Sequence, residues 1–187
     1  LSAQQRFDAE IANSRCFSLL PTGWQQYCDV VAGDVTLTDL GIDPVQAQHL
    51  QATLTHIIHC AASVSFDLPI AEAAHINING ALNVHDFAGK ITQLIRLVDV
   101  STAYITPHSS RAAQGAIAVV PEVLSPLPFD AAAVYASIQA GTADEAALLA
   151  QTGHPNTYTF TKCLAETLLA AHNSLPMTIV RPCQPCC

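Results

Sequence analysis

Short apolar segments alternate along this chain with longer segments of helical character, and this alternation limits the possible folds more than any other feature. Each apolar segment is short enough for a strand and lacks the spacing of a helix. The intervening segments are suited to helices, with proline near a permitted first turn in two of them. The pattern predicts strands at residues 27–31, 56–60, 94–100 and 177–180, irregular chain at 121–128, and helices at 44–53, 69–88, 131–151 with a break at Gly141, and from Pro155 onward.

Continuous apolar strands that alternate with helices are typical of a parallel sheet covered by helices on both faces. We therefore predict an α/β fold built on a doubly wound parallel sheet. Ligands of such sheets bind beyond the carboxyl ends of the strands. Small or polar residues, each ordinary for a loop when taken singly, follow all four predicted strands: Gly33-Asp34, Ala61-Ala62-Ser63, Ser101-Thr102 and Arg181-Pro182.

Tyr158 and Lys162 stand four residues apart near the start of the last predicted helix. The chain has four tyrosines and two lysines, so chance gives only about 0.04 pairs at this spacing. Side chains four residues apart share a helix face. Because an ammonium group favours a nearby phenolate, the pair predicts a tyrosine that donates a proton to a developing oxyanion. The alternative is a surface helix that carries one aromatic side chain and one charge.

The composition excludes several classes of function. The formal net charge of −8 argues against binding to a nucleic-acid backbone, and no basic run favours an anionic membrane surface. No apolar stretch is long enough to span a membrane, and no secretory signal is visible. The 187 residues correspond to about one domain. A charged fraction of only 12% indicates a well-buried interior or a piece of a larger protein.

The seven cysteines do not predict a metal site. Four of them are scattered through apparent core segments, which is ordinary for a reduced protein, so we expect an intracellular location. The segment Cys183-Gln-Pro-Cys186-Cys187 contains a C-x-x-C pattern. A zinc site needs about four ligands, and no second cysteine or histidine pair with ligand spacing completes this one.

Longer stretches between Tyr27 and Pro182 carry a more specific pattern. They read HIIHCAASVSFD at residues 56–67, NING at 77–80, VDVSTAY at 98–104, HPNTYTFTKCLAE at 154–166 and LPMTIVRP at 175–182, preceded by VAGD at 31–34. These stretches resemble the extended short-chain dehydrogenase/reductases, and most closely the fatty acyl-CoA reductases with the male-sterility type of NAD(P)-binding domain. The PNTYTFTK run is specific within that superfamily, whereas the Tyr/Lys pair alone is not. The long segment between Tyr104 and His154 also resembles an insertion of this family.

The resemblance implies a Rossmann-like fold and a set of catalytic residues. Tyr158 would be the general acid. Lys162 would promote ionisation of that phenol and hold the nicotinamide ribose. Thr102, rather than Ser101, would hydrogen-bond the thioester or aldehyde oxygen.

The resemblance also implies a cofactor and a substrate. The cofactor would be NADPH, with NADH as the second candidate, and the substrate a long-chain acyl-CoA that is reduced through the aldehyde to the alcohol. Proteins of this family are often associated with peroxisomal or endoplasmic reticulum membranes. The residues that would lie against the dinucleotide are Asp34, Val35, Ala61, Ala62, Ser63, Asn77, Lys162, Arg181 and Pro182.

One departure from the family pattern concerns glycine. The eight glycines never fall within three residues of one another, so the chain has no G-x-G-x-x-G turn for a pyrophosphate. We therefore interpret residues 1–187 as a partial NAD(P)-binding reductase domain that lacks the first βαβ unit and the carboxyl-terminal substrate part. Such a piece is expected to be inactive alone and to self-associate through an apolar face and an open sheet edge.

Two other readings stay open at the level of the sequence. The chain could come from a thioester reductase domain of a carboxylic acid reductase or peptide synthetase, or from a nucleotide-sugar epimerase or dehydratase of the same superfamily. An upstream carrier-protein domain would favour the synthetase class. The chain could also be an inactive truncated product whose ancestor was an enzyme.

Overall fold

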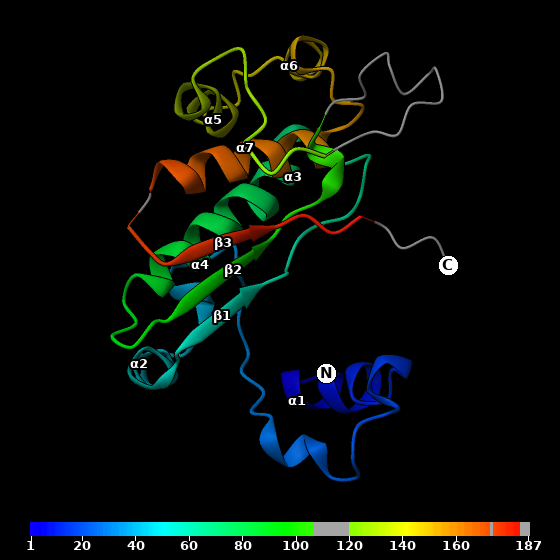
Figure 1. Cartoon of the computed structure of the whole chain (residues 1–187), viewed down its shortest axis with the longest axis vertical. Coiled ribbons are helices and arrows are strands. Elements are labelled where there is room, and N and C mark those ends of the chain that lie inside the picture. The colour runs from blue at the N-terminus through cyan, green and yellow to red at the C-terminus, as the bar shows by residue number, and fades with distance from the viewer. Residues whose placement is uncertain (107–119, 173, 184–187) are drawn as a thin grey trace.

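A three-stranded parallel sheet forms the centre of the protein in the computed structural model, which describes residues 1–106, 120–172 and 174–183. Figure 1 shows its three arrows pointing the same way. The register places Ile57 beside Leu97 and Leu97 beside Met177. The predicted parallel sheet is confirmed, and its strands, in their order across the sheet, are β1 (His56–His59), β2 (Arg96–Val100) and β3 (Met177–Val180).

Helices cover one face of this sheet in two layers. The inner layer contains α4 (Gly80–Ala88), which contacts β1 and β2, and α7 (Thr157–Ala171), which packs against α4. The outer helices α5 (Ala131–Gln139) and α6 (Glu145–Thr152) pack on α7, farther from the strands (Figure 1). The main core lies between these layers, with Ile78, Phe160, Leu164 and Leu169 among its most buried side chains.

The opposite face of the sheet is open in the described part of the chain. Ile58 on β1 is 72% exposed and Val180 on β3 is 43% exposed. Our prediction of helices on both faces is therefore wrong for these residues. Right-handed crossovers that advance in one direction, from β1 to β2 to β3, place their helices on the same face.

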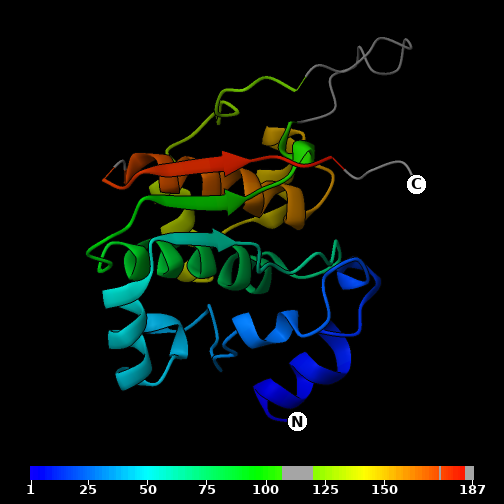
Figure 2. The ribbon, with the colours of Figure 1, turned by 60° about the horizontal axis from the view of Figure 1, so that its bottom comes forward.

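The predicted strand at residues 27–31 is also wrong. Residues 24–27 form a turn of 3-10 helix, and residues 28–34 are irregular. A strand needs a neighbour to complete its hydrogen bonds, and none of the described strands pairs with this segment. The preceding residues form α1 (Ala3–Arg6) and short turns, which pack Phe7 and Phe17 around Trp24. This amino-terminal segment lies apart from the helical layers in Figure 2.

The helices begin and end at residues that satisfy their free backbone groups. Asp43 accepts the N–H groups of Val45 and Gln46 at the start of α2 (Pro44–Thr53), as expected for a cap followed by proline. Gly141 adopts a left-handed φ of 69°, which confirms the predicted break between α5 and α6. The last predicted helix starts two residues later than expected, because Asn156 caps α7 by accepting the N–H of Thr159 and leaves Pro155 outside.

The long helix predicted at residues 69–88 is interrupted by a wider turn. It consists of α3 (Ile70–Ala74), a π-helical turn (His75–Asn79) and α4. Turns of this kind insert an extra residue and often occur at functional sites. Here the turn carries Asn77, one of the residues predicted to contact the dinucleotide.

Protonation of His154 should destabilise the fold in acid. This buried imidazole lies just before α7, with Nδ1 3.2 Å from Thr159 Oγ1, and burial lowers its pKa from 6.5 to about 4. The unfolded chain therefore binds its proton first as the pH falls, so the stabilisation is complete above pH 6.5 and is lost toward pH 4. Between pH 6.5 and pH 4, the free energy of unfolding of His154→Asn should fall by about 3 kcal/mol less than that of the wild type, as measured by urea unfolding. An exposed control, His49→Asn, should leave the slope unchanged, and an equal slope for the wild type and His154→Asn would contradict the assignment.

Candidate active site

Lys162 reaches the carboxyl end of β2 from helix α7. Its side chain is buried, 2% exposed, and Nζ donates a hydrogen bond of 2.8 Å to the carbonyl oxygen of Val100. One turn earlier on the same helix, Tyr158 is only half-buried, and its ring is tilted against Phe66 with the centroids 5.6 Å apart. The structure therefore holds the ammonium group in place at the end of β2 and leaves the Tyr158 ring half-buried against Phe66. Both side chains lie where the sequence predicts chemistry in a parallel sheet.

The two hydroxyl groups that follow β2 are buried and differ in their partners. Thr102 Oγ1 accepts the N–H of Tyr104 at 3.2 Å and starts the short 3-10 turn Ala103–Ile105, which packs against α7. Its proton remains available to a further acceptor. Ser101 Oγ has no hydrogen-bond partner among the described residues. Because successive side chains on extended backbone point in opposite directions, only one of the two can face a bound carbonyl group.

The amide of Asn77 joins two parts of the site. Its Oδ1 accepts the N–H of Ser63 at 2.9 Å, and its Nδ2 donates to Thr161 Oγ1 at 3.1 Å. Ser63 lies in the loop after β1, and Thr161 precedes Lys162 on α7. The π-helical turn thus ties the loop with Ala61 and Ala62 to the helix with the Tyr/Lys pair.

Asp34 and Val35 lie beside helix α4, apart from the Tyr158–Lys162 pair. The Asp34 carboxylate accepts the hydroxyl and the N–H of Thr36, and these bonds lower the pKa of Asp34. The Val35 carbonyl accepts Asn83 Nδ2 at 2.8 Å. A Cβ atom at Gly80 would lie 3.1 Å from Val35 Cγ2, so the absence of a side chain there permits the close approach.

The guanidinium group of Arg181, which we predicted to contact the cofactor, has two protein partners. It forms a bidentate ion pair with the buried Glu166, with an Nε–Oε1 distance of 3.0 Å, and donates to the Pro121 carbonyl at 2.8 Å. Glu166 raises the pKa of Arg181 through this hydrogen bond. The neighbouring Pro182 carbonyl accepts the N–H of Ala103, so the chain after β3 lies beside the chain after β2.

Two buried titratable residues near Lys162 escaped the sequence analysis. His59 ends β1 and Asp99 lies opposite it on β2, with 3.9 Å between Nε2 and Oδ1. Both atoms lack a hydrogen-bond partner among the described residues. Burial lowers the pKa of His59 to about 4, so the imidazole is neutral near pH 7 and the contact is not an ion pair there. The sequence does contain a signal for these two residues, because each is an ionisable side chain inside an otherwise apolar strand segment.

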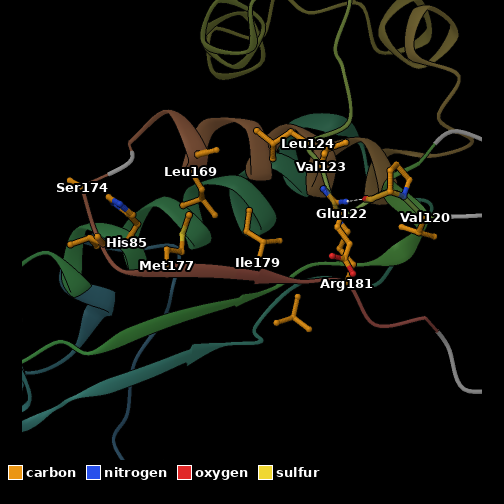
Figure 3. A pocket seen from close by; sticks show the side chains of 14 residues that line it. His85, Val120, Glu122, Val123, Leu124, Leu169, Ser174, Met177, Ile179 and Arg181 are labelled. Carbon is orange, nitrogen blue, oxygen red and sulfur yellow. Dashed lines mark hydrogen bonds between the residues drawn. The ribbon is translucent and has the colours of Figure 1, made fainter.

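A pocket of about 790 Å³ lies away from the Tyr/Lys pair. Figure 3 shows it beside β3, with Met177 and Ile179 below Leu169 and with the segment from Val120 to Leu124 on the Arg181 side. Of the predicted site residues only Arg181 lines it, and that side chain already binds Glu166. The predicted catalytic residues Thr102, Tyr158 and Lys162 do not line this pocket.

Comparison with known proteins agrees with this geometry. A family model of an NAD-binding domain, described as "Male sterility protein", matches residues 1–184. The chain belongs to this family. A Drosophila melanogaster protein with a provisional fatty acyl-CoA reductase name is 35% identical over 158 residues, which cover 81% of the chain and 29% of that protein. The D. melanogaster "Fatty acyl-CoA reductase wat" is 30% identical over 167 residues, which cover 82% and 29%.

A solved structure supports the fold assignment. The terminal R domain from the myxalamid PKS-NRPS biosynthetic pathway matches 98% of the chain and 40% of its own, with a TM-score of 0.67 and 21% identity. This likeness supports the predicted α/β fold with a parallel sheet, while the family assignment rests on the family model. The chain spans less than a third of the length of the two D. melanogaster relatives.

The side chains present fit the nicotinamide end of a dinucleotide. Lys162 uses one N–H for Val100 and has two more to donate, and the proton of Thr102 is available. Ala61 and Ala62 offer no bulk at the end of β1. The sequence supplies no glycine-rich turn for the pyrophosphate, so the fit is limited to the nicotinamide half of the dinucleotide.

The described part of the chain shows neither a cluster of metal ligands nor a membrane-spanning helix. Residues 1–106, 120–172 and 174–183 contain no group of three ligand-type side chains placed to hold a metal ion, and Cys186 and Cys187 lie outside these ranges. Among the same residues, no helix combines the length and apolar character needed to cross a bilayer.

Removal of the Asn77 amide should weaken the fold and the site together. Asn77→Ala leaves the half-buried N–H of Ser63 without its partner and removes a buried amide, so we expect a loss of about 2 kcal/mol in the free energy of unfolding, measured in urea. The control Asn13→Ala removes an exposed amide that donates to the Asp8 carbonyl and should change stability by less than about 0.5 kcal/mol. Equal effects of the two variants would show that Asn77 does not tie the loop to α7.

Proposed function

We propose that the chain carries the carbonyl-reducing site of an NADPH-dependent reductase that converts long-chain fatty acyl-CoA to fatty alcohol through the aldehyde. The observation that carries the proposal is the buried Lys162 ammonium group, which is held on the Val100 carbonyl one helical turn after the half-buried Tyr158. Val100 lies two residues before the buried Thr102 in the same strand-end segment. The names of the D. melanogaster relatives supply the substrate class and favour acyl-CoA over other carbonyl compounds.

In the proposed mechanism the protein positions and polarises a carbonyl group. A reduced nicotinamide, when bound, would supply one hydride to the thioester carbon, with release of the CoA thiol to leave the aldehyde, and a second reduced nicotinamide would supply the hydride that converts the aldehyde to the alcohol. Thr102 donates a hydrogen bond to the carbonyl oxygen, whose negative charge grows as the carbon is reduced. Tyr158 transfers its phenolic proton to that oxygen, and the Lys162 ammonium stabilises the phenolate that is left.

The cofactor-binding roles follow the arrangement of the loops. Lys162 would also donate to the nicotinamide ribose, while Ala61, Ala62 and Ser63 would lie along the dinucleotide and Asp34 with Val35 near its adenine. Asn77 would act indirectly, because its side chain holds the backbone of Ser63 through a hydrogen bond. Arg181 and Pro182 would border the site through the chain after β3, with the Arg181 guanidinium occupied by Glu166. NADPH is the proposed cofactor and NADH the second candidate, in an intracellular enzyme.

Replacement of the general acid tests the proposal. In a full-length protein that carries residues 1–187, Tyr158→Phe should lower acyl-CoA reduction at least about a hundredfold, because no other group donates the proton. The assay follows the loss of NADPH absorbance. Tyr27→Phe removes a hydroxyl from a tyrosine that is 85% exposed and should leave the rate unchanged. Near-normal turnover of Tyr158→Phe would overturn the proposal.

Lys162→Ala should act on both the rate and the cofactor. We expect the rate to fall with that of Tyr158→Phe and the Kd for NADPH to rise by roughly tenfold, because donors to the ribose are lost. Calorimetric titration of the same full-length protein with NADPH checks the second effect. An unchanged Kd would remove the ribose role from Lys162.

The two neighbouring hydroxyls should differ in importance. Thr102→Ala should reduce kcat by about tenfold or more, the scale for losing a hydrogen bond to a developing oxyanion, whereas Ser101→Ala should have a smaller effect. Steady-state kinetics of both variants under one set of conditions compares them directly. A larger loss for Ser101→Ala would transfer the carbonyl contact to Ser101.

A further inference from the structure

Phe66 presents an exposed aromatic ring beside the predicted catalytic tyrosine. The centroids of the Phe66 and Tyr158 rings lie 5.6 Å apart, with 47° between the ring planes. Phe66 is still 58% exposed despite this contact, and Val64 on the same loop is 73% exposed. Single apolar side chains are ordinary on a surface, but these two stand beside a group that is expected to donate a proton. A carbonyl group held by Tyr158 would therefore have an apolar surface next to it.

The loop that carries Phe66 is tied to the site at both of its ends. At one end, Asn77 Oδ1 accepts the N–H of Ser63 at 2.9 Å. At the other end, Thr157 Oγ1 donates to the carbonyl oxygen of Leu68 at 2.8 Å. Thr157 is the first residue of α7 and immediately precedes the predicted catalytic tyrosine. The backbone on both sides of Phe66 therefore fixes where its ring lies, in addition to the contact between the rings.

The composition of this loop suits an alkyl chain better than the CoA group. A thioester carbonyl has two substituents, an apolar acyl chain and the phosphate-bearing CoA. Residues 63–68 read SVSFDL, with one carboxylate and no basic side chain. Phosphates are bound by basic side chains or free backbone N–H groups, and a carboxylate repels them. The N–H groups of Ser63, Ser65 and Asp67 already donate to side-chain oxygens. The alkyl chain is therefore the substituent that this loop favours.

We propose that Phe66 is a specificity-determining residue whose ring contacts the acyl chain of the substrate where the chain leaves the reacting carbonyl. This inference rests on the proposed function, because it takes Tyr158 as the group that holds the carbonyl oxygen. A proton donor lies about 3 Å from the oxygen that it protonates, so the first carbons of the chain lie close to the phenol. The Phe66 ring, which packs on that phenol, gives these carbons an apolar surface to contact.

Kinetics with the thioester and with the free aldehyde distinguish the acyl chain from the CoA group. In a full-length protein that carries residues 1–187, Phe66→Ala should raise KM about tenfold for hexadecanoyl-CoA and for hexadecanal alike, because both carry the same alkyl chain. Phe66→Leu keeps most of the apolar surface and should stay within about threefold of the wild type. An effect on the thioester that is absent with hexadecanal would assign the contact to CoA and overturn the proposal.

Two controls separate contact with the substrate from damage to the site. Tyr27→Ala removes an aromatic side chain that is 85% exposed and should leave KM unchanged. The Kd for NADPH should be the same in the wild type and in Phe66→Ala, because an exposed side chain can be removed without loss of the fold. Phe66→Ala should also change kcat by less than about threefold, the pattern of a contact made equally before and during the reaction. A lower kcat with an unchanged KM would mean that Phe66 only supports Tyr158, and would overturn the proposal.

Binding without turnover distinguishes failure of this inference from failure of the proposed function. Tyr158→Phe keeps the ring that Phe66 contacts but lacks the proton donor, so calorimetry in this background measures binding of hexadecanoyl-CoA alone. Addition of Phe66→Ala should raise that Kd about tenfold and leave the Kd of unacylated CoA unchanged. This pattern in a protein whose wild type reduces neither substrate would retain the acyl contact and reject the proposed function. Reductase activity with equal binding by the two variants would retain the function and overturn the role of Phe66.

Discussion

The buried amide of Asn77 is the contact on which the arrangement of the site depends. It accepts from the backbone of the loop after β1 and donates to the helix that carries Tyr158 and Lys162. The same helical layer also holds Val35. Gly80 has no side chain to block the Val35 side chain, and Asn83 donates a hydrogen bond to the Val35 carbonyl. One layer of helix therefore sets the relative positions of loops that are far apart in the sequence, and the π-helical turn supplies the offset that brings the Asn77 side chain between them.

The second constraint is the pairing of charge inside a chain with few charges. Lys162 and Glu166 lie one turn apart on the buried face of α7, and each meets a group from the sheet side. Glu166 binds Arg181 after β3, and Lys162 binds the Val100 carbonyl beside Asp99. These polar contacts fix the axial position and rotation of α7, while Phe160 and Leu164 supply the apolar packing. Helix α7 therefore serves both as the core of the fold and as the carrier of the predicted catalytic pair.

Local patterns explain which parts of the structure could be predicted. Strands β1, β2 and β3, the helix at residues 44–53 and the break at Gly141 depend on short-range sequence, and these predictions are confirmed. The segment at residues 27–31 has the composition of a strand but no pairing partner, which composition does not reveal. The ion pair of Arg181 with Glu166 could not be predicted from the sequence, because it forms only when β3 and α7 come together in the fold. His59 and Asp99 become neighbours through strand register, so neither residue alone indicated the cluster.

Hydrogen exchange of backbone amides with and without saturating NADPH is the most direct test of where the site lies. The predicted catalytic residues lie near the strand ends, whereas the pocket of about 790 Å³ lies beside β3. The account predicts that NADPH slows exchange at residues 61–66 and 101–105 and leaves residues 174–179, beside the pocket, unchanged. Protection confined to residues 174–179 and 120–124 would contradict it, and would mean that the dinucleotide binds at the edge of β3 rather than at the ends of the strands.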